Sequence, residues 1–230
     1  MKLHRFFVSP EAVSGKIFSL TDNEQCHQIT AVLKLKIGEQ IIALDNTGKE
    51  YLVRLEKITK TKIDGVITST GENPNEPNIK ITLYQSMIKK DNFEWVLQKG
   101  TELGVSAFVP MLSERSEKKS FNYERGLKIL KEAAEQSECG TIPTLEQPTN
   151  FTEVLKNKNI FLLDRSGAPL KSLNLESVEE INLLIGPEGG WSEAEIASAK
   201  ASGASVVSIG PRTLRAETAG PIAAALILNQ

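Results

Sequence analysis

Two glycine-bearing loops near the C-terminal end carry the residues whose types and spacing best suit chemistry. The loops cover residues 186–191 and 210–218, and each follows a short apolar run that is typical of a buried strand. Four charged side chains lie in them: Glu188 in the first loop, and Arg212, Arg215 and Glu217 in the second. Ligands of open α/β sheets bind where the carboxyl ends of strands face one crevice. We therefore expect both loops to surround a single ligand.

The glycines of the first loop indicate a site that uses backbone groups. Gly186, Gly189 and Gly190 allow a close approach to a ligand, or a positive φ angle, without a Cβ clash. Neither of the two common phosphate-binding patterns, G-x-x-x-x-G-K-[ST] and G-x-G-x-x-G, occurs in the chain. These absences argue against a P-loop nucleotidase and against a dinucleotide-binding domain.

The charged side chains suit the stabilisation of a developing anion. Arg215, and after it Arg212, can each donate two hydrogen bonds in one plane. Three roles are open for Glu217: a general base, a partner that orients Arg215, or a first-turn acid that complements the dipole of the last helix. Glu188 is a second candidate base, and the sequence does not choose between the two carboxylates.

Composition favours a globular chain and argues against several classes of protein. The chain has 230 residues, of which 40% are hydrophobic, enough for one large domain or two modest ones. It has two histidines and two cysteines, without metal-ligand spacing, so no metal and no disulfide framework are expected. The formal net charge of −2 leaves any RNA binding to local patches. Without a signal peptide or a long apolar run, a cytoplasmic location and no membrane contact are expected.

A polar segment with two prolines, residues 71–78, separates two expected domains. Before it, short β segments surround one helix, and a hairpin signal occurs at residues 46–48. After it, strands alternate with helices, which predicts a parallel α/β sheet. The expected domains are residues 1–72, a small β-rich domain, and residues 73–230, the α/β domain.

Capping-box pairs mark the expected starts of three helices: Thr21 with Glu24, Asp91 with Glu94, and Ser192 with Glu195. A further helix at residues 123–137 is expected to bury Leu127, Leu130 and Ala134. The final helix, 221–228, is nearly all apolar, so it needs cover from its own core or from a second subunit. A homodimer is the simpler explanation for a chain of this size.

Several ordered blocks together resemble one known family. The blocks are residues 27–34, 98–105, 114–116, 132–137, 185–190 (IGPEGG) and 209–219 (IGPRTLRAETA). They resemble the RsmE family, the 16S ribosomal RNA uridine-N3 methyltransferases of the SPOUT superfamily. The similarity spans nearly the whole chain.

This resemblance implies both a fold and an activity. It implies a SPOUT-type parallel α/β domain whose C-terminal loops and helix form a trefoil knot, preceded by a small PUA-like β-barrel that helps to hold RNA. It further implies S-adenosylmethionine as cofactor, a site completed in a homodimer, and methylation of N3 of a uridine in 16S rRNA of the small ribosomal subunit. The target nucleotide, and the choice between free rRNA and an assembled subunit, stay open.

The resemblance also assigns roles to residues. The positions expected to bind the methyl donor are Leu163, Ile185, Gly186, Glu188, Gly189, Gly190, Ile209, Gly210 and Leu214. Those expected to contact the RNA substrate are Arg5, Lys34, Lys90, Glu94, Arg115 and Gln136. At position 139 the family usually has an arginine, whereas this chain has Cys139, which we expect to be buried or half-buried.

Two alternatives remain beside this leading interpretation. One is a methyltransferase that acts on another rRNA or tRNA nucleotide. The other is a non-catalytic RNA-binding protein of ribosome assembly that keeps the fold. Intact glycine loops with Arg215 and Glu217 favour an enzyme, and binding of the methyl donor would discriminate between the two classes.

Overall fold

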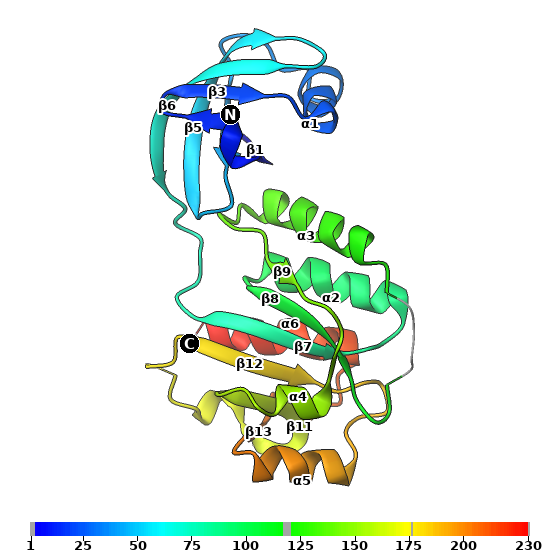
Figure 1. Ribbon diagram of the computed structural model, residues 1–230. Coiled ribbons are helices and arrows are strands. Elements are labelled where there is room, and N and C mark those ends of the chain that lie inside the picture. The colour runs from blue at the N-terminus through cyan, green and yellow to red at the C-terminus, as the bar shows by residue number, and fades with distance from the viewer. Residues whose placement is uncertain (1–2, 117–120, 176, 230) are drawn as a thin grey trace. The chain divides into compact units, whose positions relative to one another are not determined.

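The computed structural model describes residues 3–116, 121–175 and 177–229 (Figure 1). Its contacts divide the chain into two compact units. The first comprises Met1–Glu76 with Ala134–Ile142, and the second comprises Pro77–Ala133 with Pro143–Gln230. Nothing in the sequence pattern indicates that residues 134–142 join the first unit. The domain limits expected from the sequence, 1–72 and 73–230, stay a prediction.

The first unit is a six-stranded sheet in the order β1-β4-β5-β6-β3-β2. Its strands are β1 (His4–Phe7), β2 (Val13–Ser14), β3 (Ile17–Leu20), β4 (Gln40–Leu44), β5 (Lys49–Ile58) and β6 (Ile63–Glu72), with a short 3₁₀ turn, η1 (Pro10–Ala12). The expected hairpin is confirmed, because β4 and β5 pair antiparallel and Asn46 and Gly48 between them take positive φ angles. Phe6, Phe18 and Ile41 belong to the buried core of this unit.

The helical segment of the first unit differs from the expectation. Helix α1 (Asn23–His27) is capped by Asp22, whose carboxylate accepts the Gln25 amide at 2.8 Å, so the expected Thr21 cap is wrong. The chain continues as a π-helical stretch, η2 (Gln28–Val32). A π turn holds more residues than an α turn. Helical spacing in the sequence predicts one apolar face for Ile29, Val32 and Leu33, but the helical phase slips here and Val32 is exposed.

The second unit contains a sheet in the order β10-β8-β7-β12-β11-β13, with β9 paired to β8. Its strands are β7 (Lys80–Ser86), β8 (Ala107–Leu112), β9 (Thr144–Leu145), β10 (Thr149–Asn150), β11 (Ile160–Pro169), β12 (Glu180–Ile185) and β13 (Ser205–Ser208). Every recorded pair among these strands is parallel. The expected parallel α/β sheet is confirmed.

Helices cover both faces of this sheet. They are α2 (Lys90–Glu102), α3 (Tyr123–Ser137), α4 (Phe151–Val154), α5 (Glu193–Ala201) and α6 (Ala216–Leu228), with a 3₁₀ turn, η3 (Leu170–Ser172). On one face, Phe151 of α4 and Ala199 of α5 pack with Leu184 of β12. On the other, α6 packs on β7, β12 and α2, which lies beside it (Figure 1). A Cβ at Gly220 would lie 3.2 Å from Leu83 and 3.4 Å from Ile185, so α6 lies close to the sheet there.

Two helix predictions in the second unit need correction. Helix α2 starts at Lys90 after the N-cap residue Lys89, which makes no side-chain cap, so the expected Asp91 cap is wrong. In α3, Leu130 and Ala134 are buried, but Leu127 is 41% exposed. The side of the helix at Gly126 is the packed one, because a Cβ there would lie 2.7 Å from Leu145. Leu127, about 100° further round the helix, projects away from it.

The remaining cap prediction of this unit is confirmed. Ser192 and Glu195 form a capping box at the start of α5. Gly203 follows α5 with φ +87° and Gly104 follows α2 with φ +93°, a conformation that glycine adopts without a Cβ clash.

Candidate functional site

A cavity of about 830 Å³ lies in the second unit, where β12 and β13 end, beside the middle of β11. Strand β12 leads into the first glycine loop and β13 into the second, and both loops line the cavity. All nine residues expected to bind the methyl donor line it, as do Arg212, Arg215 and Glu217. The structure therefore brings together two sequence segments that are separated by a whole helix.

The first glycine loop is fixed to the neighbouring strand by Trp191. The indole Nε1 of Trp191 donates to the carbonyl of Leu163 at 2.9 Å. The indole lies close under Gly186, where a Cβ would be 3.1 Å from the ring. Gly190 has φ +66° and its amide donates to the Pro187 carbonyl at 2.9 Å, closing a tight turn. The backbone of this loop thus forms part of the cavity wall, and Trp191, which also lines the cavity, supports it.

A second support comes from Arg115, in the segment that follows β8. Its Nη1 donates to the carbonyls of Gly189 at 2.9 Å and of Trp191 at 3.2 Å. Arg115 is not among the residues that line the cavity. Its observed contacts are with the glycine loop, so the RNA contact expected for it stays a prediction.

Glu195 joins the same two segments through its carboxylate. One oxygen accepts the Glu114 amide at 2.8 Å and the other accepts the Ser192 amide at 2.9 Å. The Ser192 hydroxyl in turn donates to the Glu114 carboxylate at 2.6 Å. Glu195 is only 7% exposed, and a buried charge needs such partners. We call Glu114, Arg115, Ser192 and Glu195 the loop brace.

The second glycine loop is shorter than expected. Helix α6 begins at Ala216, and the carbonyl of Arg215 accepts the amides of Thr218 and Ala219, both at 3.0 Å. Glu217 therefore lies in the first helical turn and not in the loop. Gly210 takes φ +136°, and Arg165 of β11 donates to the Thr213 hydroxyl at 3.0 Å.

Arg215 and Glu217 differ sharply in exposure. The side chain of Arg215 is 85% exposed, whereas that of Glu217 is 13% exposed, and their charged atoms are 3.9 Å apart. An ion pair of this length and exposure contributes little stability. The Arg215 guanidinium is thus free to reach a ligand, while Glu217 gains from the positive end of the α6 dipole.

Helix α2 contributes two cavity residues that sequence reasoning missed, Lys89 and Asn92. The predicted Lys90 and Glu94 do not line the cavity. Glu94 instead accepts from Arg125 of α3 at 2.7 Å and pairs with Lys90 at 3.8 Å. Helical spacing was a signal for Asn92 only, because it lies four residues before the buried Val96, whereas Lys89 precedes the helix with a non-helical ψ of 141°.

The other residues expected to contact RNA belong to the first unit. Arg5 pairs with Glu138 at 3.1 Å and Glu50 at 3.5 Å. Lys34 is exposed with φ +54°, and Gln136 is exposed. None of the three lines the cavity.

Cys139 takes an apolar place in the first unit. It packs against a cluster that contains Phe7, Leu44 and Ala134. Burial raises the pKa of its thiol above the ordinary value. Cys139 is half-buried, as expected, and Cys26 is buried; neither forms a disulfide within the described residues.

Two further features of the chain bear on other functions. Among the described residues, no group of three or more histidine, cysteine, aspartate or glutamate side chains is arranged to hold a metal ion. In that same part of the chain, no helix has the length and apolar character to cross a membrane. What lines the cavity is backbone, an apolar wall and separate charged groups.

Comparisons with known proteins match both units. Residues 74–228 match an RNA methyltransferase domain family, and residues 20–68 match an RNA methyltransferase PUA domain family. The chain is 33% identical to ribosomal RNA small subunit methyltransferase E of Bacillus subtilis, over 94% of this chain and 93% of that one. It is 35% identical to the protein of the same name from Synechocystis, over 97% and 77%. The crystal structure of such an enzyme from Neisseria gonorrhoeae, bound to S-adenosyl methionine, gives a TM-score of 0.89 at 29% identity, over 98% and 97%.

Replacing Arg115 by alanine should loosen the first glycine loop, because two of its carbonyls lose a charged donor. We expect local opening to become easier by about 1 kcal/mol, the usual net contribution of such hydrogen bonds. Hydrogen exchange, read by mass spectrometry on peptides that cover residues 186–192, should be faster. Arg125→Ala is the control, since it removes an ion pair of α3 and leaves the loop brace intact. Unchanged exchange in Arg115→Ala would contradict the support assigned to Arg115.

Proposed function

The chain belongs to the RsmE family of ribosomal RNA methyltransferases, and we propose that it methylates N3 of a uridine in the 16S rRNA of the small ribosomal subunit, with S-adenosylmethionine as methyl donor. The observation that carries the proposal is the cavity in which both glycine loops meet. Relatives named for methylation of small-subunit rRNA match nearly the full length of the chain, which supports that class of substrate.

The cavity suits S-adenosylmethionine by size and by chemistry. Its volume of about 830 Å³ falls within the usual range for small-molecule sites. Leu163, Ile185 and Leu214 offer apolar surface for the adenine, and the glycine loops offer backbone groups for hydrogen bonds. Asp164 and Glu188 supply negative charge, which complements a sulfonium and an ammonium group. When bound, S-adenosylmethionine supplies an electrophilic methyl group and leaves as a neutral thioether.

The acceptor chemistry explains the cations of the second loop. N3 of uridine is a weakly acidic imide nitrogen that exchanges its proton for the methyl group. As the proton leaves, negative charge spreads to the two flanking carbonyl oxygens. A cation placed at one of these oxygens lowers the barrier. We assign this role to Arg215, whose exposed guanidinium lines the cavity, with Arg212 beside it in the loop.

We assign different roles to the two carboxylates. Glu217 lies 3.9 Å from Arg215 and is 13% exposed, which favours the orienting role over base catalysis. Glu188 is exposed, lines the cavity and makes no ion pair or hydrogen bond within the described residues. Glu188 is therefore the carboxylate that we propose to accept the N3 proton.

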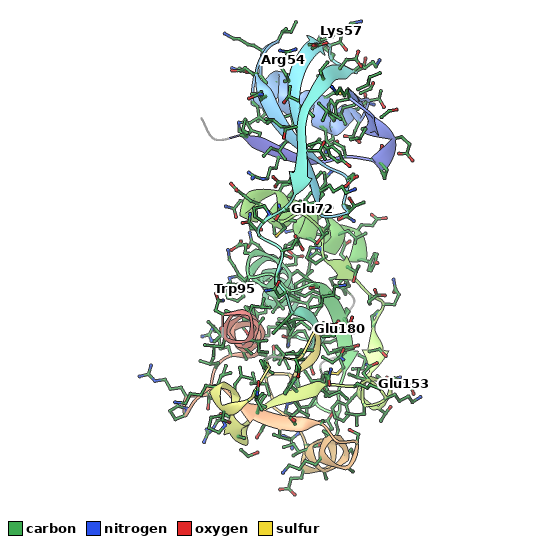
Figure 2. The ribbon with its side chains drawn as sticks, turned by 90° about the vertical axis from the view of Figure 1, so that its left-hand side faces the viewer. Arg54, Lys57, Glu72, Trp95, Glu153 and Glu180 are labelled. Atoms are coloured by element: carbon green, nitrogen blue, oxygen red, sulfur yellow. The ribbon has the colours of Figure 1, made fainter. Side chains whose placement is uncertain are left out.

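We propose that the first unit holds RNA. The match of residues 20–68 to an RNA methyltransferase PUA domain supports this role. Arg54 and Lys57 of β5 are exposed basic side chains of this unit (Figure 2). RNA contacts by Arg5, Lys34, Lys90, Glu94, Arg115 and Gln136 stay predictions, as does a cytoplasmic location. The trefoil knot also stays a prediction. The chain returns from β13 to pack α6 on β7, which is compatible with a knot.

An exposed apolar surface supports the proposed homodimer. Its residues come from α2 with its C-cap residue and from the adjacent α6: Trp95, Leu103, Ile222 and Leu226, which are 38% to 46% exposed. Figure 2 shows Trp95 beside α6, which is seen along its axis. Helix α6, which is apolar after its first turn, is thus covered by its own unit on one side only, and a second copy of the chain would cover the other.

The product of the reaction tests the proposed activity. We would incubate the protein with S-adenosylmethionine and with small subunits, or their 16S rRNA, from a strain that lacks this enzyme, and analyse the nucleosides by mass spectrometry. We expect 3-methyluridine at one position. Arg215→Ala should reduce turnover about 10²-fold or more, with methyl-donor affinity nearly unchanged, because its contact forms in the transition state. Wild-type protein that binds the methyl donor and rRNA but gives no 3-methyluridine would refute the N3 assignment.

The proposed dimer makes a separate prediction about Leu226. In Leu226→Glu a charge would have to be buried on association, so the variant should elute from a sizing column as a monomer. Leu127→Glu is the matched control, because Leu127 is 41% exposed in α3, away from the α2 and α6 surface, against 46% for Leu226. It should keep the wild-type mass. A monomeric wild-type protein would contradict the proposal.

A further inference from the structure

Two polar side chains enter the cavity from outside both glycine loops. Lys89 is the N-cap residue of α2 and Asn92 lies in its first turn, and both line the cavity. Within the described part of the chain, neither side chain makes a hydrogen bond or an ion pair. Polar groups of a cavity wall that have no internal partner are free to bind a ligand.

The start of α2 determines which polar residues near it reach the cavity. Lys89 is the N-cap residue, with a non-helical ψ of 141°, and Asn92 lies four residues before the buried Val96. Glu94 is bound by Arg125 and pairs with Lys90 at 3.8 Å, and neither Lys90 nor Glu94 lines the cavity. The neighbouring Lys89 and Lys90 thus have different surroundings.

The charge of Lys89 indicates which ligand it faces. A sulfonium is a cation, so an ammonium group beside it would raise the energy of the bound methyl donor. RNA offers the opposite charge on every phosphate, and lysine binds phosphate as a point charge. The carboxylates that suit the methyl donor, Asp164 and Glu188, come from β11 and the first glycine loop and not from α2.

We propose that Lys89 and Asn92 form an acceptor subsite for the target nucleotide of the RNA, an inference that rests on the proposed function. Lys89 binds the phosphate of that nucleotide. Asn92 donates from its side-chain amide to a carbonyl oxygen next to N3. N3 lies on the edge that pairs in a duplex, so the target base enters the cavity unpaired, and its edge groups are then available for hydrogen bonds.

The contact from Asn92 strengthens during the reaction. The carbonyl oxygen gains negative charge as the N3 proton leaves to Glu188, and an N–H donor aimed at it becomes charge-assisted. The amide of Asn92 carries two N–H donors, whereas an aspartate in its place would only accept. Asn92→Asp should therefore be more harmful than Asn92→Ala, although aspartate has almost the shape of asparagine.

The salt dependence of RNA binding tests the Lys89 contact. Each lost phosphate contact makes the plot of log K against log salt shallower by about 0.7 to 1. We expect this change in Lys89→Met, with the affinity for S-adenosylmethionine in calorimetry unchanged. The control is Lys158→Met, an exposed lysine that precedes β11 at the sheet edge opposite the cavity. It should keep the wild-type slope.

Steady-state kinetics test Asn92. We expect kcat/KM for the rRNA substrate to fall about tenfold in Asn92→Ala, and further in Asn92→Asp, with unchanged affinity for the methyl donor. A folding defect would lower the affinity for the methyl donor as well. A fall in kcat/KM for the rRNA substrate alone therefore indicates a lost contact of Asn92 and not a structural effect.

Two results would overturn the subsite. One is a weaker affinity for S-adenosylmethionine with a wild-type salt slope in Lys89→Met, which would assign Lys89 to the carboxylate of the methyl donor. The other is wild-type RNA kinetics in both Asn92 variants. Failure of the proposed function looks different, because wild-type protein would then give no 3-methyluridine. The salt slope is measured without turnover, so it tests Lys89 whichever atom is methylated.

Discussion

The hydrogen bond from the Trp191 indole to the Leu163 carbonyl holds the first glycine loop against the neighbouring strand, and the cavity depends on that attachment. The loop has no regular structure of its own, so its position must come from partners. Trp191 provides one from β11, and the loop brace provides others from the segment after β8. Gly186 is required for the same reason, since a side chain there would press on the indole. A backbone surface thereby becomes rigid enough to serve as a binding wall.

The charges of the cavity follow from the elements that carry them. The charged residues that line it are Asp164 and Arg165 of β11, Glu188 of the first loop, Arg212 and Arg215 of the second loop, Glu217 of α6, and Lys89, the N-cap residue of α2. Both signs of charge in one cavity suit two ligands of opposite charge, a sulfonium methyl donor and an RNA phosphate. Glu217 lies in the first turn of α6, where the helix dipole favours a carboxylate, and from there it can orient Arg215. The reaction needs both kinds of charge, and the fold supplies them from several segments.

Local sequence patterns predicted much of this structure. The capping box of Ser192 and Glu195, the hairpin around Gly48 and the parallel sheet follow from short-range rules of capping, turns and periodicity. The predictions that failed depended on where a helix starts or turns, or on partners that are distant in the sequence. The π turn after α1 turned Val32 outward, and the start of α2 at Lys90 brought Lys89, not Lys90, to the cavity. Arg115 matched a family block, but only the folded chain shows that it binds the carbonyls of Gly189 and Trp191. The glycine loops that line the cavity were predicted because glycines with special backbone demands are visible in sequence, whereas their contact with the methyl donor stays a prediction.

Calorimetric titration with S-adenosylmethionine tests the central claim, that the cavity between the two glycine loops binds the methyl donor. We would compare wild-type protein with Gly186→Val, whose side chain would displace the loop from Trp191, after checking by circular dichroism that the variant is folded. The account predicts saturable binding to the wild-type chain and a clear loss of affinity in the variant. No binding to folded wild-type protein, or equal binding by the folded variant, would contradict it.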